Sequence, residues 1–250
     1  MTSRELLSHH SHRPFPLPSS PWVMRQEWHD LLFAHWPLPA EMVRPLVPPQ
    51  LELDLWDGQA YVAVVPFTIR NLRPRAVPAL PVLSHFAEIN VRTYVIADGK
   101  PGVYFFSLDA ANLSAVLGAR LMYGLPYFKS EFRIHNHDHQ VHYDSRRLTT
   151  RKPAEFRATY RAVSEELSWR PMNEAVERFV SERYCLYAVT SDHLYRTDIH
   201  HLPWPLQLAS AEIAANTMAE TIPLALSGPP PLLHFSKSID VLVWWPKRVS

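Results

Sequence analysis

The stretch of residues 86–96 constrains the fold more than any other part of the sequence. Its even positions are Phe86, Glu88, Asn90, Arg92, Tyr94 and Ile96, and the odd positions between them are Ala87, Ile89, Val91, Thr93 and Val95. Alternation with a period of two is typical of a β-strand whose two faces meet different surroundings. One face is small and apolar, and the other is large, polar and aromatic. We therefore predict a long central strand here.

Similar patterns, separated by turn signals such as Asp57-Gly58 and Asp98-Gly99, predict further strands. We expect strands over residues 51–55, 59–68, 86–96, 102–108, 127–134, 141–147, 156–164, 184–190, 194–200 and 235–245. Residues 70–84 predict a surface loop. Helices are expected over residues 40–47, 110–123, 171–182 and 206–220, with Asp109 capping the second, and residues 27–36 are expected to form a helix or a tight apolar segment. Strands and helices do not alternate as βαβ units. The pattern favours a mainly β (α+β) fold, with an antiparallel sheet closed into a barrel or cone and a few peripheral helices.

Composition excludes several classes of protein. The formal net charge of the 250 residues is +1, so no overall field would attract nucleic acid. A single cysteine, Cys185, excludes an internal disulfide framework and a multi-cysteine metal site. Six glycines against 24 prolines make a glycine-rich phosphate loop improbable.

The first 21 residues differ in composition from the rest of the chain. Residues 1–21 contain three His, four Pro and five Ser, which predicts a flexible tail, and residues 22–250 predict a single domain. No stretch approaches the roughly 20 apolar residues that span a bilayer, and the first residues lack the apolar core of a secretory signal. We therefore expect a cytoplasmic protein without a membrane partner. The oligomeric state stays open, a homo-oligomer included.

Several ordered stretches carry a family resemblance. They are residues 32–36 (LFAHW), 65–67 (VPF), 88–95 (EINVRTYV), 102–110 (GVYFFSLDA), 125–128 (LPYF), 182–184 (ERY) and 201–206 (HLPWPL). Together they resemble an uncharacterised bacterial family, the YqjF-like proteins, over residues 22–245. That family is in turn remotely similar to acetoacetate decarboxylase. The resemblance implies an acetoacetate-decarboxylase-like antiparallel β cone that encloses a polar cavity.

The chemistry of acetoacetate decarboxylase transfers less well than its fold. That enzyme forms a Schiff base on one of two adjacent lysines, which follow a Gly-x-Pro motif. Here Gly124-Leu125-Pro126 is followed by Tyr127 and Phe128, and the nearest lysine is Lys129. The resemblance matches the cavity glutamate of the enzyme with Glu88. Glu88 and Lys129 are therefore the catalytic candidates, and whether the protein is an enzyme is left open.

The polar face of residues 86–96 is the strongest candidate for a ligand site. Our candidate ligand-binding residues are Glu88, Asn90, Arg92, Tyr94, Arg120 and Tyr127. A structural polar network is the alternative interpretation of the strand residues. Arg120 lies at the margin of an apolar helical stripe, where it either pairs with an acid such as Asp109 or Glu88, or clamps a ligand. Arg183 and Tyr184 permit the same two interpretations, with the structural one favoured.

Metal and cofactor sites are not expected. His135, His137, His139 and His142 form a local cluster, but Asn136 and Asp138 between them are turn residues, so the cluster is predicted to decorate a hairpin tip. Cys185 lies among large apolar neighbours and is predicted to be a buried, inert thiol.

Three functional hypotheses follow. The first is a small-molecule cavity protein that acts on a carbonyl or carboxylate compound without a Schiff base. The second is a Schiff-base decarboxylase or lyase that uses Lys129. The third is a noncatalytic ligand-binding or scaffold protein. The fold alone does not decide among them.

Overall fold

The architecture is a single, highly curved β-sheet. The computed structural model describes residues 1–79, 84–112, 124–149, 153–167, 176–226 and 228–249. The strands are β1 (Met24–Pro39), β2 (Glu52–Leu53), β3 (Gln59–Pro74), β4 (Phe86–Ala97), β5 (Lys100–Ala110), β6 (Tyr127–His137), β7 (Gln140–Arg147), β8 (Glu155–Ala162), β9 (Cys185–Thr190), β10 (His193–His200), β11 (Leu206–Asn216), β12 (Leu232–Val243) and β13 (Lys247–Arg248). The helices are α1 (Ser3–Ser8), α2 (Ala40–Val43), the 3-10 helix η1 (Arg44–Leu46) and α5 (Val176–Ser181).

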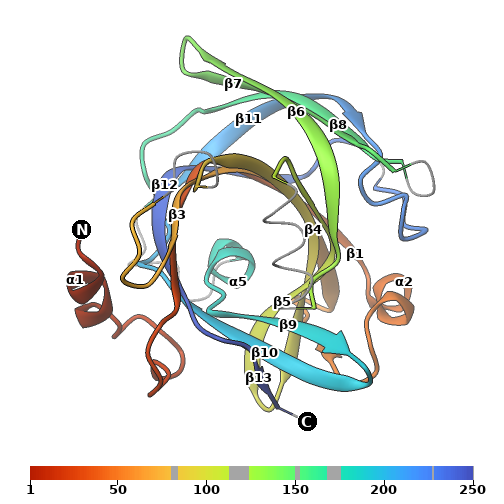
Figure 1. The fold of residues 1–250 in the computed structure, drawn as a ribbon. Coiled ribbons are helices and arrows are strands. Elements are labelled where there is room, and N and C mark those ends of the chain that lie inside the picture. The colour runs from red at the N-terminus through yellow and green to blue at the C-terminus, as the bar shows by residue number, and fades with distance from the viewer. Residues whose placement is uncertain (80–83, 113–123, 150–152, 168–175, 227, 250) are drawn as a thin grey trace.

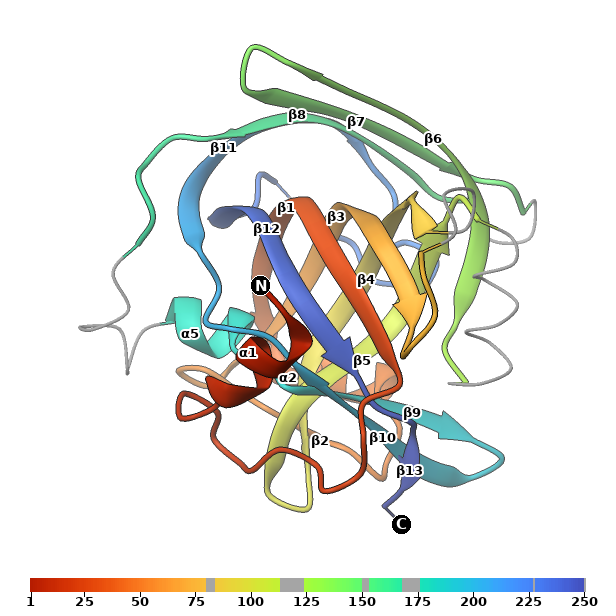
Figure 2. The same cartoon turned by 60° about the vertical axis from the view of Figure 1, so that its left-hand side comes forward.

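The pairings of these strands close two circuits that share a wall. Strands β12, β1, β3, β4, β5, β9 and β10 form a ring, which we call the inner barrel, because β10 pairs with both β9 and β12. Strands β6, β7, β8 and β11, which we call the outer sheet, run from β5 to β12 and arch over one side of the inner barrel (Figures 1 and 2). The described pairings are antiparallel except β5–β6 and β5–β9. The predicted mainly β barrel is therefore confirmed.

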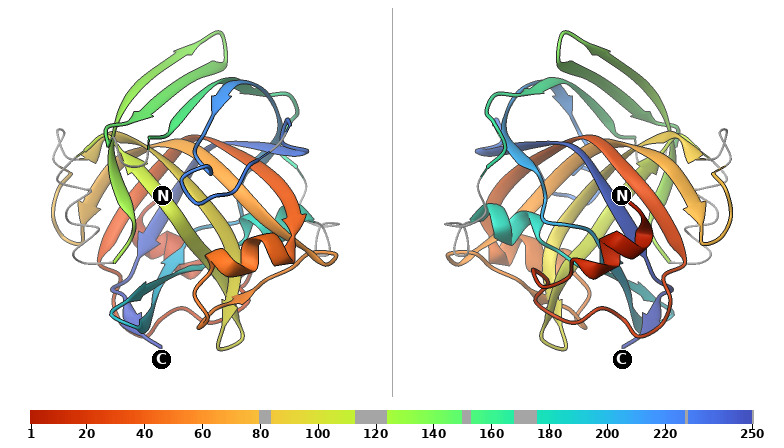
Figure 3. Two further views of the ribbon diagram at one scale, coloured as in Figure 1. Left: turned by 90° about the vertical axis from the view of Figure 1, so that its right-hand side faces the viewer. Right: turned by 90° about the vertical axis from the view of Figure 1, so that its left-hand side faces the viewer.

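The larger apolar core lies between the inner barrel and the outer sheet. It joins Val62, Val64, Ile89 and Val91 of the shared wall to Tyr143, Phe156 and Tyr160 of the outer sheet. These wall residues include the small apolar face predicted for residues 86–96. Helix α2 packs against the outside of the barrel (Figure 3), and its Val43 joins the same core.

Helix α5 lies within the ring of the inner barrel when the molecule is viewed along its axis (Figure 1). Its Val180 packs with Tyr94, Val103 and Leu108 on the inner surface of β4 and β5. The polar face of β4 is therefore directed toward the interior of the inner barrel, which α5 partly fills.

Residues 27–36, predicted as a helix or a tight apolar segment, and much of the helix predicted over residues 206–220 form strands. Residues 27–36 lie in β1, whose residues Leu31 to Trp36 are all buried, because one face meets the inner barrel and the other meets the core beneath the outer sheet. A strand buried on both faces loses the alternation that identifies it. Residues 206–216 form β11, where Leu208, Ser210 and Glu212 are exposed and the residues between them are half-buried. Tertiary packing overrides the helical preference of its alanines.

Other boundaries also differ from prediction. Strand β3 continues through Pro74, into the predicted loop. Asp109 does not cap a helix, because Asp109 and Ala110 are the last residues of β5. The rest of the predicted helix, residues 113–123, lies outside the described residues. Helix α5 confirms the later part of the helix predicted over residues 171–182.

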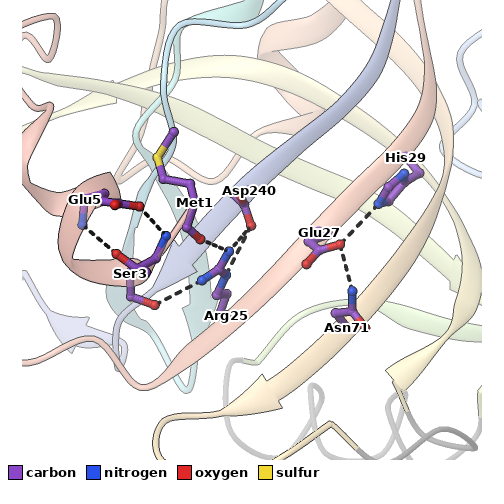
Figure 4. Close-up of polar contacts among 9 residues, drawn as sticks. Met1, Ser3, Glu5, Arg25, Glu27, His29, Asn71 and Asp240 are labelled. Atoms are coloured by element: carbon purple, nitrogen blue, oxygen red, sulfur yellow. Dashed lines mark hydrogen bonds and ion pairs between the residues drawn. The ribbon is translucent and has the colours of Figure 1, made fainter.

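The N-terminal segment, predicted to be a flexible tail, packs on the outside of the barrel. Leu6 of α1 is buried against Leu242 and Trp244. Figure 4 shows Arg25 of β1 donating hydrogen bonds to Asp240 of β12 and to the carbonyl of Met1. Beside it, Glu27 accepts a hydrogen bond from Asn71 of β3. Within the described part of the chain, no helix is long and apolar enough to cross a membrane.

Candidate functional site

A cavity of about 540 Å³ occupies the interior of the inner barrel. Its volume falls within the range of sites that hold small molecules. Most of the residues that line it are apolar. They come from the seven strands of the inner barrel, from β6 and α5, and from segments between these elements. It reaches the surface beside Pro74 and Trp245, both of which are exposed, so one end of the barrel forms its mouth.

Strand β4 contributes the polar residues that run along one wall. Glu88, Asn90 and Arg92 line the cavity at every second position, because alternate side chains of a strand share a face. The register shift between β4 and β5 at Val91 and Arg92 places Arg92 opposite Phe105, another lining residue. The polar atom Oδ1 of Asn90 is buried and has no hydrogen-bond partner among the described residues.

Glu88 is a buried carboxyl group that stays largely protonated at neutral pH. It is 4% exposed, and its Oε2 accepts a 2.8 Å hydrogen bond from the hydroxyl of Tyr127, which also lines the cavity. Desolvation raises the pKa of Glu88 to about 8, the Tyr127 hydrogen bond opposes that shift, and the nearby charge of Asp109 adds to it. A neutral carboxyl group can donate a hydrogen bond, which a carboxylate cannot.

Arg92 is a buried cation without an acidic partner among the described residues. It is 8% exposed, and its Nε has no hydrogen-bond partner there. Its Nη2 makes only long contacts, 3.4 Å to the carbonyl of Val180 and 3.5 Å to the hydroxyl of Tyr94. The guanidinium carbon lies 5.4 Å from the centre of the Phe33 ring. Charges buried in a folded protein are normally paired, so Arg92 has unused capacity for an anion.

The other arginine of the cavity is already neutralised. Arg183 forms an ion pair with Asp54 and donates from Nε to the carbonyl of Phe179 at 2.7 Å. Arg183 and Arg92 lie 5.0 and 5.7 Å from the centre of the Tyr94 ring. With two guanidinium groups near the Tyr94 ring and a single carboxylate, that of Asp54, paired with Arg183, this end of the cavity is positive.

Tyr94 and His35 form a network beside the cavity. Tyr94, one of the predicted ligand-binding residues, is fully buried and is not among the residues that line the cavity. Its hydroxyl donates to the carbonyl of Val180 at 2.8 Å and accepts from Nε2 of His35 at 2.7 Å. Burial, together with the charge of Arg92, holds the pKa of His35 well below its usual range. Sequence reasoning missed His35 because residues 27–36 were expected to form a helix or a tight apolar segment, so the side chains that share a strand face with His35 were not predicted.

Lys129 and Tyr184, two further candidates from the sequence, do not line the cavity. Lys129 donates from Nζ to the carbonyl of Ala111 and does not line the cavity. Glu131, two residues further along β6, pairs with Arg146. Arg120 lies outside the described residues. Tyr184 is fully buried and donates to Glu182, and it does not line the cavity.

The remaining candidates lie away from the cavity. The four histidines of the predicted cluster are all exposed on the β6–β7 hairpin, which turns at Asp138 and His139. Among the residues that the structure describes, no group of three or more His, Cys, Asp or Glu side chains could hold a metal ion. Cys185 is buried, as predicted, and desolvation raises the pKa of its thiol to about 11.

Comparison with known sequences identifies relatives of uncharacterised function. Residues 25–240 match the DUF2071 family model, which is described as an uncharacterized conserved protein. The chain is also 44% identical over 228 residues to the uncharacterized protein YqjF of Bacillus subtilis strain 168, covering 91% of this chain and 93% of the relative.

Solved structures with the same fold are much more distant in sequence. Acetoacetate decarboxylase from Legionella pneumophila aligns with a TM-score of 0.60 at 14% identity, over 96% of this chain and 93% of its own. An acetoacetate decarboxylase-like enzyme from Sphingomonas wittichii RW1 aligns with a TM-score of 0.63 at 12% identity, over 95% and 98%. The enduracididine biosynthesis enzyme MppR, complexed with pyruvate, aligns with a TM-score of 0.60 at 10% identity, over 92% and 91%. At these identities the likeness establishes the fold alone. The match of the family model over residues 25–240 shows that the protein belongs to the DUF2071 family, and it has an acetoacetate-decarboxylase-like β-barrel fold.

Proposed function

We propose that the protein binds a small carboxylate or carbonyl compound noncovalently inside the inner barrel. The observation that carries this proposal is Arg92, a buried cation with an unpaired Nε and no acidic partner among the described residues. A carboxylate of the ligand would supply the missing partner through charge-assisted hydrogen bonds. Small-molecule sites are typically concave and apolar with a few convergent polar groups, which describes this cavity.

Glu88 supplies the second polar contact of the proposed site. Because Tyr127 donates to its Oε2, the proton of the neutral carboxyl group belongs on Oε1, from which it can be donated to a carbonyl oxygen. A carboxyl group with a pKa of about 8 also exchanges its proton near neutral pH. This arrangement supports chemistry at a carbonyl or carboxylate compound without a covalent enzyme intermediate.

The Schiff-base alternative requires Lys129, and its surroundings oppose that role. A nucleophilic lysine must be uncharged and must reach the substrate. Lys129 donates to a backbone carbonyl outside the set of cavity residues. Borohydride reduction in the presence of acetoacetate tests this alternative. We expect no covalent adduct. An adduct at Lys129 that disappears in Lys129→Met would favour the Schiff-base mechanism over our proposal.

Calorimetric titration tests the proposed site directly. The probes are octanoate and 3-phenylpropanoate, with their neutral amides as controls for charge. Arg92→Met should weaken acid binding by at least about ten-fold, since hydrogen bonds to charged groups contribute about 1.5–3 kcal/mol, and should change amide binding little. The matched control is Arg161→Met, which removes an exposed arginine of β8.

The outcomes separate the hypotheses. If no acid binds the wild-type protein, or if Arg92→Met binds acids as tightly as the wild type does, the proposal is wrong. Mass spectrometry of the probes after prolonged incubation distinguishes catalysis from binding. Unchanged probes support the noncatalytic hypothesis for these compounds, and a product that disappears in Glu88→Gln supports an enzymatic role.

A further inference from the structure

We infer that the ligand of this cavity is an amphipathic carboxylic acid, with its carboxylate at Arg92 and an extended apolar body that reaches toward the mouth. This inference rests on the proposed function and narrows the class of compound that the site would take. It follows from the order in which polar and apolar residues line the cavity, from its size, and from its charge.

The register of the strands gives the cavity a polar deep end and an apolar outer end. Phe86 pairs with Ile69 near the mouth, where β3 approaches its end, and Glu88 pairs with Phe67 two positions further in. Among the lining residues of β4, Arg92 lies furthest from the mouth, beside the carbonyl of Val180 in α5. Six residues of extended strand separate Phe86 from Arg92, which corresponds to about 20 Å. A carboxylate at Arg92 therefore leaves a long path to the mouth for the rest of the ligand.

Large apolar side chains wall this path. The lining residues of β1, β3 and β4 nearest the mouth include Trp28, Phe67, Ile69, Leu72 and Phe86. A polar ligand body, such as a sugar or a second carboxylate, would exchange its hydrogen bonds to water for few partners here, because Gln26, the polar lining residue of β1, already accepts a hydrogen bond from Nε1 of Trp28. An aliphatic or aromatic body would instead gain the free energy of removing apolar surface from water.

The size of the cavity exceeds the needs of a short keto acid. Acetoacetate has about seven non-hydrogen atoms, and even at the roughly 30 Å³ that each water occupies in the liquid it would fill less than half of the space. The cavity of about 540 Å³ therefore accommodates a considerably longer acid.

The charge of the site suits a monoanion. Arg92 has no acidic partner among the described residues, whereas Arg183 is paired with Asp54. Tyr127 and Glu88, further toward the mouth, present a hydroxyl group and a carboxyl group. One net positive charge at the deep end and no second unpaired cation in the described lining match a single carboxylate.

Calorimetry of a homologous series tests this inference on the full-length protein. The probes are straight-chain acids from butanoate to decanoate, with the primary alcohols of the same lengths as controls. We expect the dissociation constant of the acids to fall by up to about four-fold for each added methylene until the cavity is filled. Each alcohol should bind at least about ten-fold more weakly than its acid, because it lacks the charge that Arg92 meets.

A variant at the mouth locates the apolar body. Leu72 is half-buried, so Leu72→Asp places a charge beside the outer end of a long ligand at a tolerant position. We expect decanoate binding to weaken at least ten-fold and butanoate binding to stay within two-fold. The matched control is Leu208→Asp, on the exposed face of β11 outside the cavity. Circular dichroism of each variant confirms that it is folded.

The inference and the proposed function fail in different ways. Equal affinities for butanoate and decanoate, or equal weakening of both acids by Leu72→Asp, would overturn the amphipathic ligand while leaving a carboxylate site intact. Absence of binding by every acid in the series would overturn the proposed function itself.

Discussion

Glu88 shows how one position in the barrel changes the behaviour of an ordinary side chain. Its carboxyl group is buried in the cavity wall, accepts one hydrogen bond and lies near Asp109, and desolvation outweighs the stabilising hydrogen bond. Glu131, on the exposed face of β6, is the same residue type in water. The buried environment, and not the residue type, therefore sets the raised pKa of Glu88.

This difference predicts a pH-dependent stability. The pKa of Glu88 is about 8 in the folded protein, against 4.5 for a glutamate in water, so between these pH values the folded protein retains a proton that the unfolded chain has released. The stabilisation is fully present below pH 4.5 and is lost as the pH rises through 8. Glu88→Gln should remove this pH dependence. The dependence amounts to at most about 5 kcal/mol of the free energy of unfolding when Glu88 ionises completely.

Urea denaturation at pH 6 and pH 9 measures the effect. The stability difference between wild type and Glu88→Gln should shift in favour of the variant at the higher pH, whereas the control Glu131→Gln should track the wild type. Parallel pH profiles for wild type and Glu88→Gln would show that the Glu88 carboxyl group has an ordinary pKa.

Among elements, the outer sheet is joined to the inner barrel by a buried ion pair. Arg147 of β7 donates to both carboxylate oxygens of Asp109 of β5, from Nε at 2.7 Å and from Nη2 at 2.6 Å. Ser130 of β6 donates to the same carboxylate at 2.6 Å, and the guanidinium carbon of Arg147 lies 4.0 Å from the centre of the Phe128 ring. Three strands therefore meet at one fully satisfied carboxylate.

Loss of either partner would leave a buried charge uncompensated. Arg147→Met should destabilise the protein by about 3–5 kcal/mol. The adjacent Arg146 is an ideal control, since its pair with Glu131 has side chains 68% and 61% exposed, and Arg146→Met should cost less than about 1 kcal/mol. Denaturant unfolding measures both. Similar losses for the two variants would mean that burial does not govern this pair.

The same elements show which parts of the fold are predictable from sequence. Strand β4 was predictable because its two faces meet an apolar core and a polar cavity, so its residues alternate. The β6–β7 hairpin was predictable because turn residues separate two alternating segments. Strand β1 was not, because burial on both faces removes alternation. Asp109 was misassigned as a helix cap because its partner, Arg147, is distant in the sequence and near only in the folded sheet.

The polar residues of the candidate site were predictable from the sequence, but its apolar wall was not. Alternation along residues 86–96 identified Glu88, Asn90 and Arg92 as neighbours, and the structure lines the cavity with all three. It could not identify the apolar wall around them, because Trp28, Phe67 and Leu72 lie on strands whose lumen-facing positions depend on barrel closure. Bulges add to this difficulty, since the register of β1 against β3 shifts between His29 and Ala34 and changes which side chains face inward.

At the scale of the whole molecule, the sheet encloses two separate interior spaces, one filled by side chains and one that contains a cavity. The space between the inner barrel and the outer sheet is filled by the aromatic side chains of the main core, whereas the space inside the inner barrel retains a cavity. Protein interiors are normally close-packed, and an unfilled, partly polar space of this size is characteristic of a binding site. The outer sheet thus completes the core on one side, and the inner barrel keeps room for the ligand that we propose.

The N-terminal segment completes the molecule from outside, and its contribution can be measured. Leu6 is 1% exposed against Leu242 and Trp244, and the carbonyl of Leu6 lies 2.9 Å from Nε2 of His200. Leu6→Ala should therefore lower the free energy of unfolding by about 2–4 kcal/mol, as expected for truncation of a buried leucine. Leu208→Ala, which truncates an exposed leucine of β11, should change it by less than about 0.5 kcal/mol. Denaturant unfolding of the full-length chain compares the two variants. If Leu6→Ala were as stable as Leu208→Ala, the segment would be a loose tail in solution, as its composition predicts, and the docked position of α1 would contribute nothing to the stability of the barrel.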